Sequence, residues 1–341
     1  MDDFYTLDSE SQAGRMREVA AAAAAHWGIE PAGLELIKYR ENAVFKLVDP
    51  GGDRYALRIH RAGYHSDASL RAELAWMAAL AESGVAVPEV LPGPGGDSFV
   101  VVTTAGVPEP RQVDIFHWVN GRQLGSVEAG LDDTEGIARC YELLGEQAAR
   151  VHNQAVDWVL PDGFQRHAWD VDGLVGEQPF WGRFWELTSL REDERGLLSR
   201  ARERVRRDLA RYRDDPANGG RYSMIHADMV AENLLVDGDT VRLIDFDDAG
   251  FGWHLFELAT ALYFEMEQPY YPEARAALVA GYRRHRHLPE TQLSQLPLFL
   301  LARSFTYLGW VHTRSETETA RELTPMLTAK ACRLAREYLG E

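Results

Sequence analysis

The chain has 341 residues, of which 45% are hydrophobic and 26% are charged. This is the composition of an ordinary globular protein with enough residues for two domains or one large one. The formal net charge of −17, from 36 basic and 53 acidic residues, argues against a general nucleic-acid binder and against an anionic membrane surface as partner.

Cysteine usage and hydropathy also indicate an ordinary globular protein. Cys140 and Cys332 lie far apart and outside any Cys-x-x-Cys pattern, so the sequence indicates neither a disulfide framework nor a zinc site. The start Met1-Asp2-Asp3 lacks the basic region of a signal peptide. The apolar run 298–311 contains Arg303 and is too short to span a bilayer. We therefore expect a cytoplasmic protein.

The first part of the chain is predicted to contain two helices and four strands. In chain order they cover residues 9–27 (helix), 43–48 and 55–59 (strands), 67–83 (helix), 98–104 and 111–119 (strands). Asp49-Pro50-Gly51-Gly52-Asp53 is a strong turn signal between the first two strands. Gly28 and Gly84 are placed to end the two helices. This order predicts a small antiparallel sheet with a helix against it, the α+β pattern.

The rest of the chain is predicted to be mainly helical. A long helix is expected over 134–152, capped by Asp132, Asp133 or Thr134, and a charged helical region over 183–212. A short hairpin is expected over 233–245, turning at Asp237-Gly238-Asp239, and helices from Phe256 onward. We place the boundary so that residues 1–119 form a sheet-rich lobe and 120–341 a helical lobe. A cleft between two lobes is a favoured place for a cofactor.

Three polar residues have the spacing that phosphoryl transfer requires. Asp228 and Asn233 follow His226 in one segment, and Asp245 follows in Ile244-Asp245-Phe246. One carboxylate can orient an attacking hydroxyl, while an amide oxygen and a second carboxylate can hold Mg²⁺ beside nucleotide phosphates. The alternative is that Asp228 and Asn233 only cap a turn.

His226-x-Asp228-x4-Asn233 followed by Ile244-Asp245-Phe246 resembles the catalytic motif of the aminoglycoside phosphotransferase and choline kinase-like family. The resemblance extends over about residues 34–330 and implies a two-lobed protein-kinase-like fold with a small antiparallel-sheet N-lobe and a larger, mainly helical C-lobe. It also implies that Asp228 is the catalytic base or hydroxyl-orienting group, that Asn233 and Asp245 bind Mg²⁺, and that His226 supports the catalytic loop.

Kinases of this fold usually carry a Lys on the third strand, paired with a Glu on the next helix and with ATP phosphates. Arg58 occupies that position here, and Glu73 lies on the following predicted helix. Only three lysines occur, Lys38, Lys46 and Lys330, so Lys46 is the reserve candidate. Arg can grip phosphate with two parallel N–H groups. The alternative is that Arg58 is a surface residue of an edge strand.

Two further segments resemble nucleotide contacts of the family. Glu41-Asn42 resembles the loop that covers the phosphates in its small-molecule kinases, where no Gly-rich loop is present. Trp118 lies in a segment, 116–121, that resembles the hinge where backbone groups meet adenine. The aromatic residues of this hinge could equally form plain core. Those of the stretch 164–185 are predicted to build either a substrate wall or core, and periodicity does not separate the two.

Acidic residues are the candidates for recognising the acceptor. Phe256-Glu257 resembles the segment that braces the catalytic loop, with Glu where the family more commonly has Asp. Hydroxylysine-kinase-like relatives share this pairing, which favours small amino alcohols. An ammonium group could be received by an acid near the metal site or one helix later: Asp247, Asp248, Glu265 or Glu267. The alternative is that each of these is a solvated or capping acid.

Our leading hypothesis is therefore an ATP- and Mg²⁺-dependent kinase. Its acceptor would be a hydroxyl of a small amine-bearing metabolite similar to homoserine, hydroxylysine or choline, or an aminoglycoside. A bacterial protein Ser/Thr kinase is the second hypothesis; the lack of a recognisable activation segment ending in Ala-Pro-Glu counts against a conventional one. The third, a non-catalytic nucleotide-binding module, is disfavoured by the intact set of Asp228, Asn233 and Asp245. The acceptor, the choice of ATP or GTP and the oligomeric state stay open.

Overall fold

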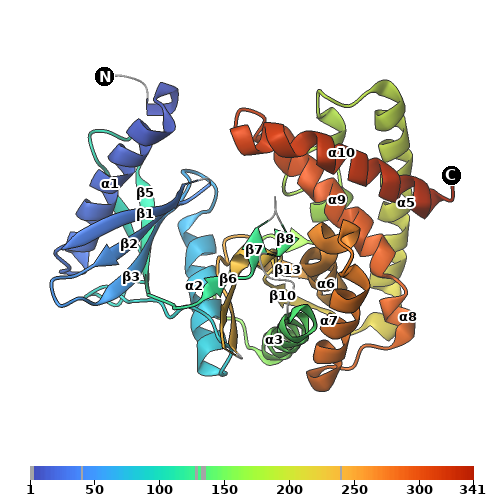
Figure 1. Ribbon diagram of the computed structural model, residues 1–341, viewed down its shortest axis with the longest axis horizontal. Coiled ribbons are helices and arrows are strands. Elements are labelled where there is room, and N and C mark those ends of the chain that lie inside the picture. The colour runs from blue at the N-terminus through green and yellow to red at the C-terminus, as the bar shows by residue number, and fades with distance from the viewer. Residues whose placement is uncertain (1–3, 40, 127–129, 132–135, 239) are drawn as a thin grey trace. The chain divides into compact units, whose positions relative to one another are not determined.

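The computed structural model describes residues 4–39, 41–126, 130–131, 136–238 and 240–341 (Figure 1). These residues form two compact units. Unit 1 is Met1–Gly121 together with Leu160–Gln165, and unit 2 is Arg122–Val159 together with Arg166–Glu341. Within the described ranges, no helix is both long and apolar enough to cross a membrane.

Unit 1 is built on an antiparallel sheet with strand order β1-β2-β3-β5-β4. Its helices and strands are α1 (Ser9–His26), β1 (Gly33–Tyr39), β2 (Ala43–Val48), β3 (Arg54–Ile59), α2 (Asp67–Glu82), β4 (Val100–Val102) and β5 (Arg111–His117). All six predicted elements of this region are present. The sequence reading missed β1, an edge strand whose alternation fails because Ile37 is exposed and a bulge interrupts the register between Leu36 and Lys38.

The two faces of this sheet have different roles. Phe45 and Leu47 of β2 and Leu57 and Ile59 of β3 are buried in one cluster with α1, which lies along that face (Figure 1). Because side chains alternate along a strand, Arg58 points to the opposite face, where it meets α2. The sheet therefore presents a buried cation on the side away from its apolar core.

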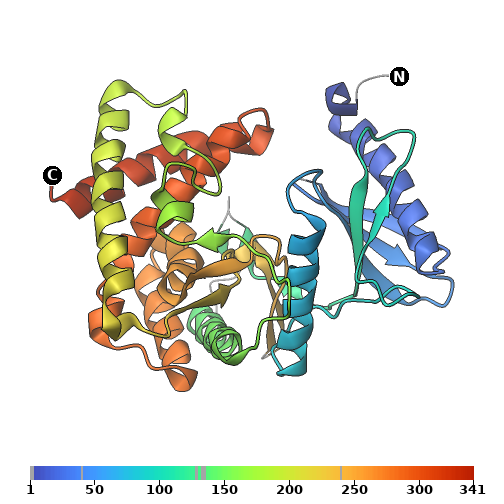
Figure 2. The same ribbon diagram turned by 180° about the vertical axis from the view of Figure 1, so that it is seen from behind.

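Unit 2 is mainly helical. Its first part contains β6 (Arg122–Gln123), β7 (Gly125–Ser126), β8 (Gly130–Leu131), α3 (Ile137–Asp157), β9 (Ala168–Trp169), α4 (Val171–Val175) and α5 (Glu192–Asp214). Its second part contains β10 (Tyr222–Ile225), β11 (Leu234–Asp237), β12 (Thr240–Leu243), β13 (Gly250–Trp253), α6 (His254–Tyr263), α7 (Tyr271–His285), α8 (Glu290–Leu293), α9 (Leu296–Thr313) and α10 (Glu318–Leu339). Unit 2 also contains the small sheets β10-β13-β9 and β12-β11-β6, and its helices α5, α9 and α10 pack against one another (Figure 2). The predicted α+β class is confirmed.

Element boundaries in unit 2 differ from the prediction at two places. The helix expected over 183–212 begins only at Glu192, where the Glu194 side chain accepts a hydrogen bond from the backbone N–H of Arg191. Phe184, which precedes it, is fully buried and stacks on Phe305 at 4.5 Å, so this segment belongs to the core. The long helix α3 begins after Gly136; the caps predicted at residues 132–134 lie outside the described residues, as does Asp239 of the predicted hairpin turn.

Candidate functional site

Two non-glycine residues of the described chain have a positive φ, and both lie in the predicted catalytic segments. They are Ala227, with φ 64°, and Asp245, with φ 65°. This left-handed conformation costs a non-glycine residue on the order of 1 kcal/mol. Such residues gather at functional sites, where the surrounding structure holds the strained backbone in place.

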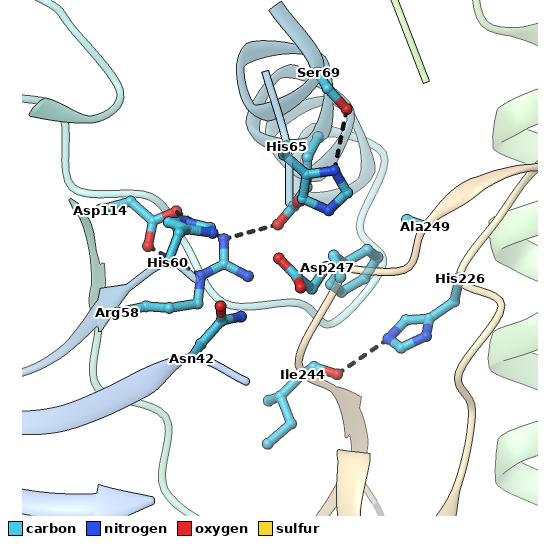
Figure 3. A network of polar contacts seen from close by, with 12 residues as sticks. Asn42, Arg58, His60, His65, Ser69, Asp114, His226, Ile244, Asp247 and Ala249 are labelled. Atoms are coloured by element: carbon cyan, nitrogen blue, oxygen red, sulfur yellow. Dashed lines mark hydrogen bonds and ion pairs between the residues drawn. The ribbon is translucent and has the colours of Figure 1, made fainter. Parts of the chain in front are cut away.

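His226 connects the loop after β10 to the end of the hairpin. Its Nε2 donates to the carbonyl oxygen of Ile244 at 3.0 Å (Figure 3), and its Nδ1 accepts from the backbone N–H of Asp228 at 3.2 Å. A ring that donates through one nitrogen and accepts through the other is neutral. Burial lowers the pKa of His226 to about 4, which agrees with a neutral ring. His226 thus fixes two loops relative to each other.

Asn233 orients Asp228. Its Nδ2 donates to the backbone oxygen of Asp228 at 3.0 Å and to Oδ2 of the same residue at 2.8 Å. The backbone oxygen of Asn233 in turn accepts from the N–H of Ile244 at 3.0 Å. Asp245, whose side chain is exposed, directly follows Ile244. The structure therefore brings together the segments that carry Asp228, Asn233 and Asp245, as the motif predicts.

Glu257 of α6 braces the loop from inside the protein. Its Oε2 accepts from the backbone N–H of His226 at 2.6 Å and its Oε1 from that of Ala227 at 3.0 Å. Complete burial raises the pKa of Glu257 to about 8, although both backbone N–H groups and the Arg303 guanidinium favour the carboxylate. By accepting from two successive backbone N–H groups, the Glu257 side chain holds the loop at Ala227 in its left-handed conformation.

We expect Glu257→Ala to lower the free energy of unfolding by at least about 2 kcal/mol. The substitution leaves two buried backbone N–H groups without an acceptor, and each such group costs about 1–3 kcal/mol. Urea unfolding followed by far-UV circular dichroism measures the loss. Glu257→Gln, which keeps the shape and one acceptor oxygen, is the matched variant and should lose less. Equal midpoints for wild type and Glu257→Ala would contradict the bracing role.

Arg303 is a component of the site that the sequence reading missed. It lies in the middle of α9, is fully buried, and its Nη2 donates to Oδ1 of Asp228 at 2.9 Å and to the hydroxyl of Tyr307 at 2.8 Å. In the sequence, Arg303 stands out only as a charge that interrupts an apolar run. The sequence nevertheless carries a usable signal. An Arg in the middle of an apolar helix is expected to be buried, and a buried charged residue almost always has a partner.

The acids considered for an ammonium group differ in their surroundings. Glu267 is within 2.9 Å of Arg333 and 3.6 Å of Lys330, and the hydroxyl of Tyr270 donates to Glu265 at 2.6 Å. These contacts argue for structural roles for Glu265 and Glu267. Asp247 is largely buried. The side chain of Asp248 is half-buried, and its Oδ1 accepts from Trp181 Nε1 at 3.3 Å.

The aromatic stretch 164–185 contributes mainly to the core. Trp169 and Phe184 are fully buried, and Trp181 is nearly so. Trp169 Nε1 also donates to the backbone oxygen of Asp248 at 3.0 Å. The indoles of Trp169 and Trp181 therefore both fix Asp248, one through its backbone and one through its side chain.

In unit 1, several buried polar side chains are gathered around Arg58. Its Nη2 lies 2.7 Å from Oε1 of Glu73, the ion pair that the sequence predicts. Its Nε and Nη2 also donate to the two carboxylate oxygens of Asp114, at 3.1 and 2.7 Å, and His60 Nε2 lies 3.0 Å from the same carboxylate (Figure 3). Arg58 is only 5% exposed, so the alternative of a surface strand residue is wrong.

Asp114 and His60 were not found from the sequence. Asp114 lies directly opposite Arg58 in the pairing of β3 with β5, a contact that requires the strand register to be known. Burial by itself would raise the pKa of Asp114, but the Arg58 guanidinium and the His60 ring outweigh it and hold that pKa below its ordinary value. A guanidinium that contacts two carboxylates through its fork explains why Arg, rather than Lys, suits this position.

Arg58→Ala is expected to lower the free energy of unfolding by about 3–5 kcal/mol, because it leaves two buried carboxylates without their cation. Arg58→Lys should fall between wild type and Arg58→Ala, since an ammonium cannot reproduce the fork. Lys46→Ala is the control: Lys46 pairs with Glu35 at 3.8 Å near the surface, and such pairs contribute about 0–1 kcal/mol. Urea titrations of the four proteins check the order.

The remaining predicted nucleotide contacts have local partners in unit 1. Oδ1 of Asn42 accepts from the backbone N–H of Arg61 at 3.0 Å. The N–H of Trp118 donates to the oxygen of Arg54 at 3.1 Å, and the ammonium group of Lys46 lies 5.4 Å from its ring centroid. Nucleotide binding by Asn42 and Trp118 stays a prediction.

The antiparallel sheet followed by a mainly helical unit, with the loop and hairpin that carry Asp228, Asn233 and Asp245, defines the kinase-like class of phosphotransferases. A family model described as "Phosphotransferase enzyme family" (APH) matches residues 35–293. The chain belongs to this family.

Three similar proteins illustrate the range of the family. The solved structure of a microcompartment-associated aminopropanol kinase is 33% identical, covers 95% of this chain and 98% of its own, and has a TM-score of 0.82. Amicoumacin kinase of Bacillus subtilis (strain 168) is 22% identical over 315 residues, 89% of this chain and 87% of its own length. Homoserine kinase of Chelativorans sp. (strain BNC1) is 31% identical over 179 residues, 48% of this chain and 51% of its own.

These findings confirm the family, the fold class and the enzyme class that the sequence predicts. The chain is an ATP-dependent phosphotransferase of the small-molecule kinase type. The acceptor differs among the similar proteins, so membership of the family does not specify it.

Proposed function

We propose that this kinase transfers the γ-phosphoryl group of ATP to the hydroxyl of a small amino alcohol, with Asp228 orienting the hydroxyl. One observation carries the proposal: the two carboxylate oxygens of Asp228 are held by different donors, Oδ1 by Arg303 and Oδ2 by Asn233. About a fifth of its side chain (21%) is exposed to solvent, so a small acceptor can reach it. A carboxylate fixed in this way supplies the orientation on which phosphoryl transfer mainly depends.

The donor set next to Asp228 fits Mg²⁺. Because both hydrogen bonds of the Asn233 amide nitrogen go to Asp228, its Oδ1 faces the other way and is suited to be a ligand. Asp245 adds a carboxylate, and an all-oxygen set is what this hard cation prefers. Asn233 and Asp245 would hold the ion, which when bound neutralises charge on the phosphates. His226 keeps the two ligand-bearing segments together through Ile244.

The nucleotide contacts are assigned to unit 1. Arg58, held in place by Glu73 and Asp114, would position the phosphates, Asn42 would lie in the loop that covers them, and Trp118 would belong to the adenine contact. If neither Arg58→Lys nor Arg58→Ala changed ATP affinity or rate, this alignment would be wrong. Equilibrium titration with ATP and steady-state kinetics measure the two quantities.

The class of acceptor is inferred from similarity and from charge. The aminopropanol kinase, at 33% identity over nearly the whole of both chains, acts on an amino alcohol by its name. Asp248, whose carboxylate is held by Trp181, is the acid we assign to the acceptor's ammonium group. Glu267 is already paired with two cations.

Purified protein incubated with Mg·ATP and a panel of acceptors tests the proposal through ADP release. The panel contains 1-amino-2-propanol, ethanolamine, homoserine, hydroxylysine, choline, an aminoglycoside and a generic protein substrate. We expect the highest turnover with a small amino alcohol. The matched control is 1,2-propanediol, which keeps the secondary hydroxyl and lacks the amine; it should react far more slowly, and Asp248→Asn should reduce that preference.

The other outcomes separate the competing hypotheses. Phosphoryl transfer only to the protein substrate would identify a protein Ser/Thr kinase. Transfer to the aminoglycoside alone would indicate a resistance enzyme. ATP binding without turnover on any acceptor would leave a nucleotide-binding module.

A further inference from the structure

Arg303 is the buried cation of an otherwise apolar helix. Of the α9 residues Leu296–Thr313, all from Leu298 to Leu308 are buried, and Arg303 has no exposed area. Its guanidinium carbon lies 4.2 Å from the ring centroid of Tyr307, 4.7 Å from that of Trp181 and 5.5 Å from that of Phe256. Aromatic faces attract a guanidinium and hold it in a defined plane.

This arrangement is costly for the fold. Moving a guanidinium out of water costs several kcal/mol even after relaxation. Arg303 recovers part of that cost through Asp228 and Tyr307, but its Nε and Nη1 are buried and donate no hydrogen bond to any described residue. A well-packed apolar side chain often stabilises such a position better than an ion pair does. Stability alone is therefore a poor reason for an Arg at this position.

The contact with Asp228 supplies a different reason. Arg303 donates to Oδ1 at 2.9 Å, whereas Asn233 donates to Oδ2 at 2.8 Å. Asn233 lies in the loop segment, and Arg303 lies in helix α9, 70 positions later in the chain. Two donors on different oxygens fix the plane of the carboxylate, and neither donor alone can do so. The aromatic rings around Arg303 keep its own donor group from moving.

We propose that Arg303 is a positioning residue for phosphoryl transfer: it fixes the carboxylate plane of Asp228 and thereby the direction of the acceptor hydroxyl. This inference rests on the proposed function, because it requires Asp228 to orient the acceptor. Arg303 itself contacts neither acceptor nor nucleotide, since it is fully buried. Its removal should therefore lower kcat far more than it changes KM for ATP.

A double-mutant cycle of kcat tests the inference. The proteins are wild type, Arg303→Met, Asp228→Asn and the double variant, each assayed by single-turnover phosphoryl transfer to the best acceptor of the panel. We expect Arg303→Met to lower kcat about 10²-fold, the loss that a misplaced reacting group produces. In the Asp228→Asn background the same substitution should have almost no further effect, because the carboxylate that it positions is already absent.

Tyr307→Phe removes one hydrogen bond from Arg303 and keeps the aromatic face. Its effect on kcat should be smaller than that of Arg303→Met, and it should diminish in the Asp228→Asn background because it acts through Arg303. Arg303→Lys, which keeps the charge and loses the fork, should recover part of the loss of Arg303→Met.

An equal loss from Arg303→Met in both backgrounds would overturn the inference and show a structural role, because a fold defect lowers the active fraction in either background. Full activity of Asp228→Asn would instead overturn the proposed function. Thermal unfolding of each variant confirms that folded proteins are compared.

Discussion

Asp228→Asn is expected to lower kcat by about 10³-fold, within the range that positioned acid–base groups supply, when equal amounts of folded protein are compared, because the variant also removes the anion paired with buried Arg303. The two side chains have the same shape. An amide, however, has one acceptor oxygen where the carboxylate has two, so its NH₂ group must face either Arg303 or Asn233, which are both donors. The variant loses the charge and also the fixed orientation of the group.

Single-turnover measurement of phosphoryl transfer, with ATP affinity determined separately, isolates the chemical step. Asp237→Asn is a matched control: Asp237 ends β11 in the same unit, is exposed, and pairs with Arg242 at 3.4 Å. It should keep wild-type kcat. If Asp228→Asn and Asp237→Asn had equal activities, Asp228 would have no part in the reaction.

The second large effect concerns stability in acid. His152 of α3 and His254 of α6 are buried and stack with 4.0 Å between ring centroids and 8° between planes. His152 Nδ1 pairs with the hydroxyl of Tyr282 at 2.9 Å, and His254 Nε2 with that of Ser223 at 2.8 Å. Burial lowers the pKa of both rings well below the ordinary value of 6.5. Two stacked cations would repel each other, so the folded protein keeps both neutral.

The free energy of unfolding should therefore fall steeply as pH drops below about 6.5. In that range the unfolded chain binds protons that the folded protein excludes, and each such histidine removes up to about 1.4 kcal/mol per pH unit. His226, with a pKa of about 4, contributes a third such loss between about 6.5 and 4. Glu257 acts in the opposite direction: with its pKa raised to about 8, its contribution is present at low pH and is lost as pH rises.

Urea unfolding at several pH values between 7 and 5 measures this slope. His254→Gln removes one titrating group and should make the slope shallower. His287→Gln, at an exposed position, should leave it unchanged. A wild-type unfolding free energy that is constant from pH 7 to 5 would contradict neutral buried histidines.

The parts of the fold that the sequence predicts are those set by local patterns. The helix over Asp67–Glu82 follows from apolar spacing and a terminal glycine, and the hairpin of β2 and β3 follows from its Pro-Gly turn. Strand β1 was missed because an exposed Ile37 and a bulge break its alternation. The predicted start of α5 is too early. The residues before Glu192 are held in the core by contacts such as that of Phe184 with Phe305, and such a long-range contact is not visible in the sequence.

The residues of the candidate site also form two groups: those that a local motif reveals and those that only the structure reveals. Asp228, Asn233 and Asp245 lie within 18 positions of one another, and a local motif is enough to find them. Arg303 and Asp114 reach their partners from 75 and 56 positions away. Such contacts depend on helix packing and strand register, which one sequence does not show. Glu257 was found only through the resemblance, and its two bonds to the loop are visible only in the structure.

The Arg58 group has a practical consequence for detecting this enzyme. On the proposed alignment, Arg58 lies beside the nucleotide phosphates, where kinases of this fold usually carry a Lys. A guanidinium stays protonated at neutral pH and is not an acyl acceptor, and Arg58 is further enclosed by two carboxylates. Reagents that acylate the lysine usual at this position should therefore leave Arg58 unmodified, and a reagent for this position needs to target another side chain.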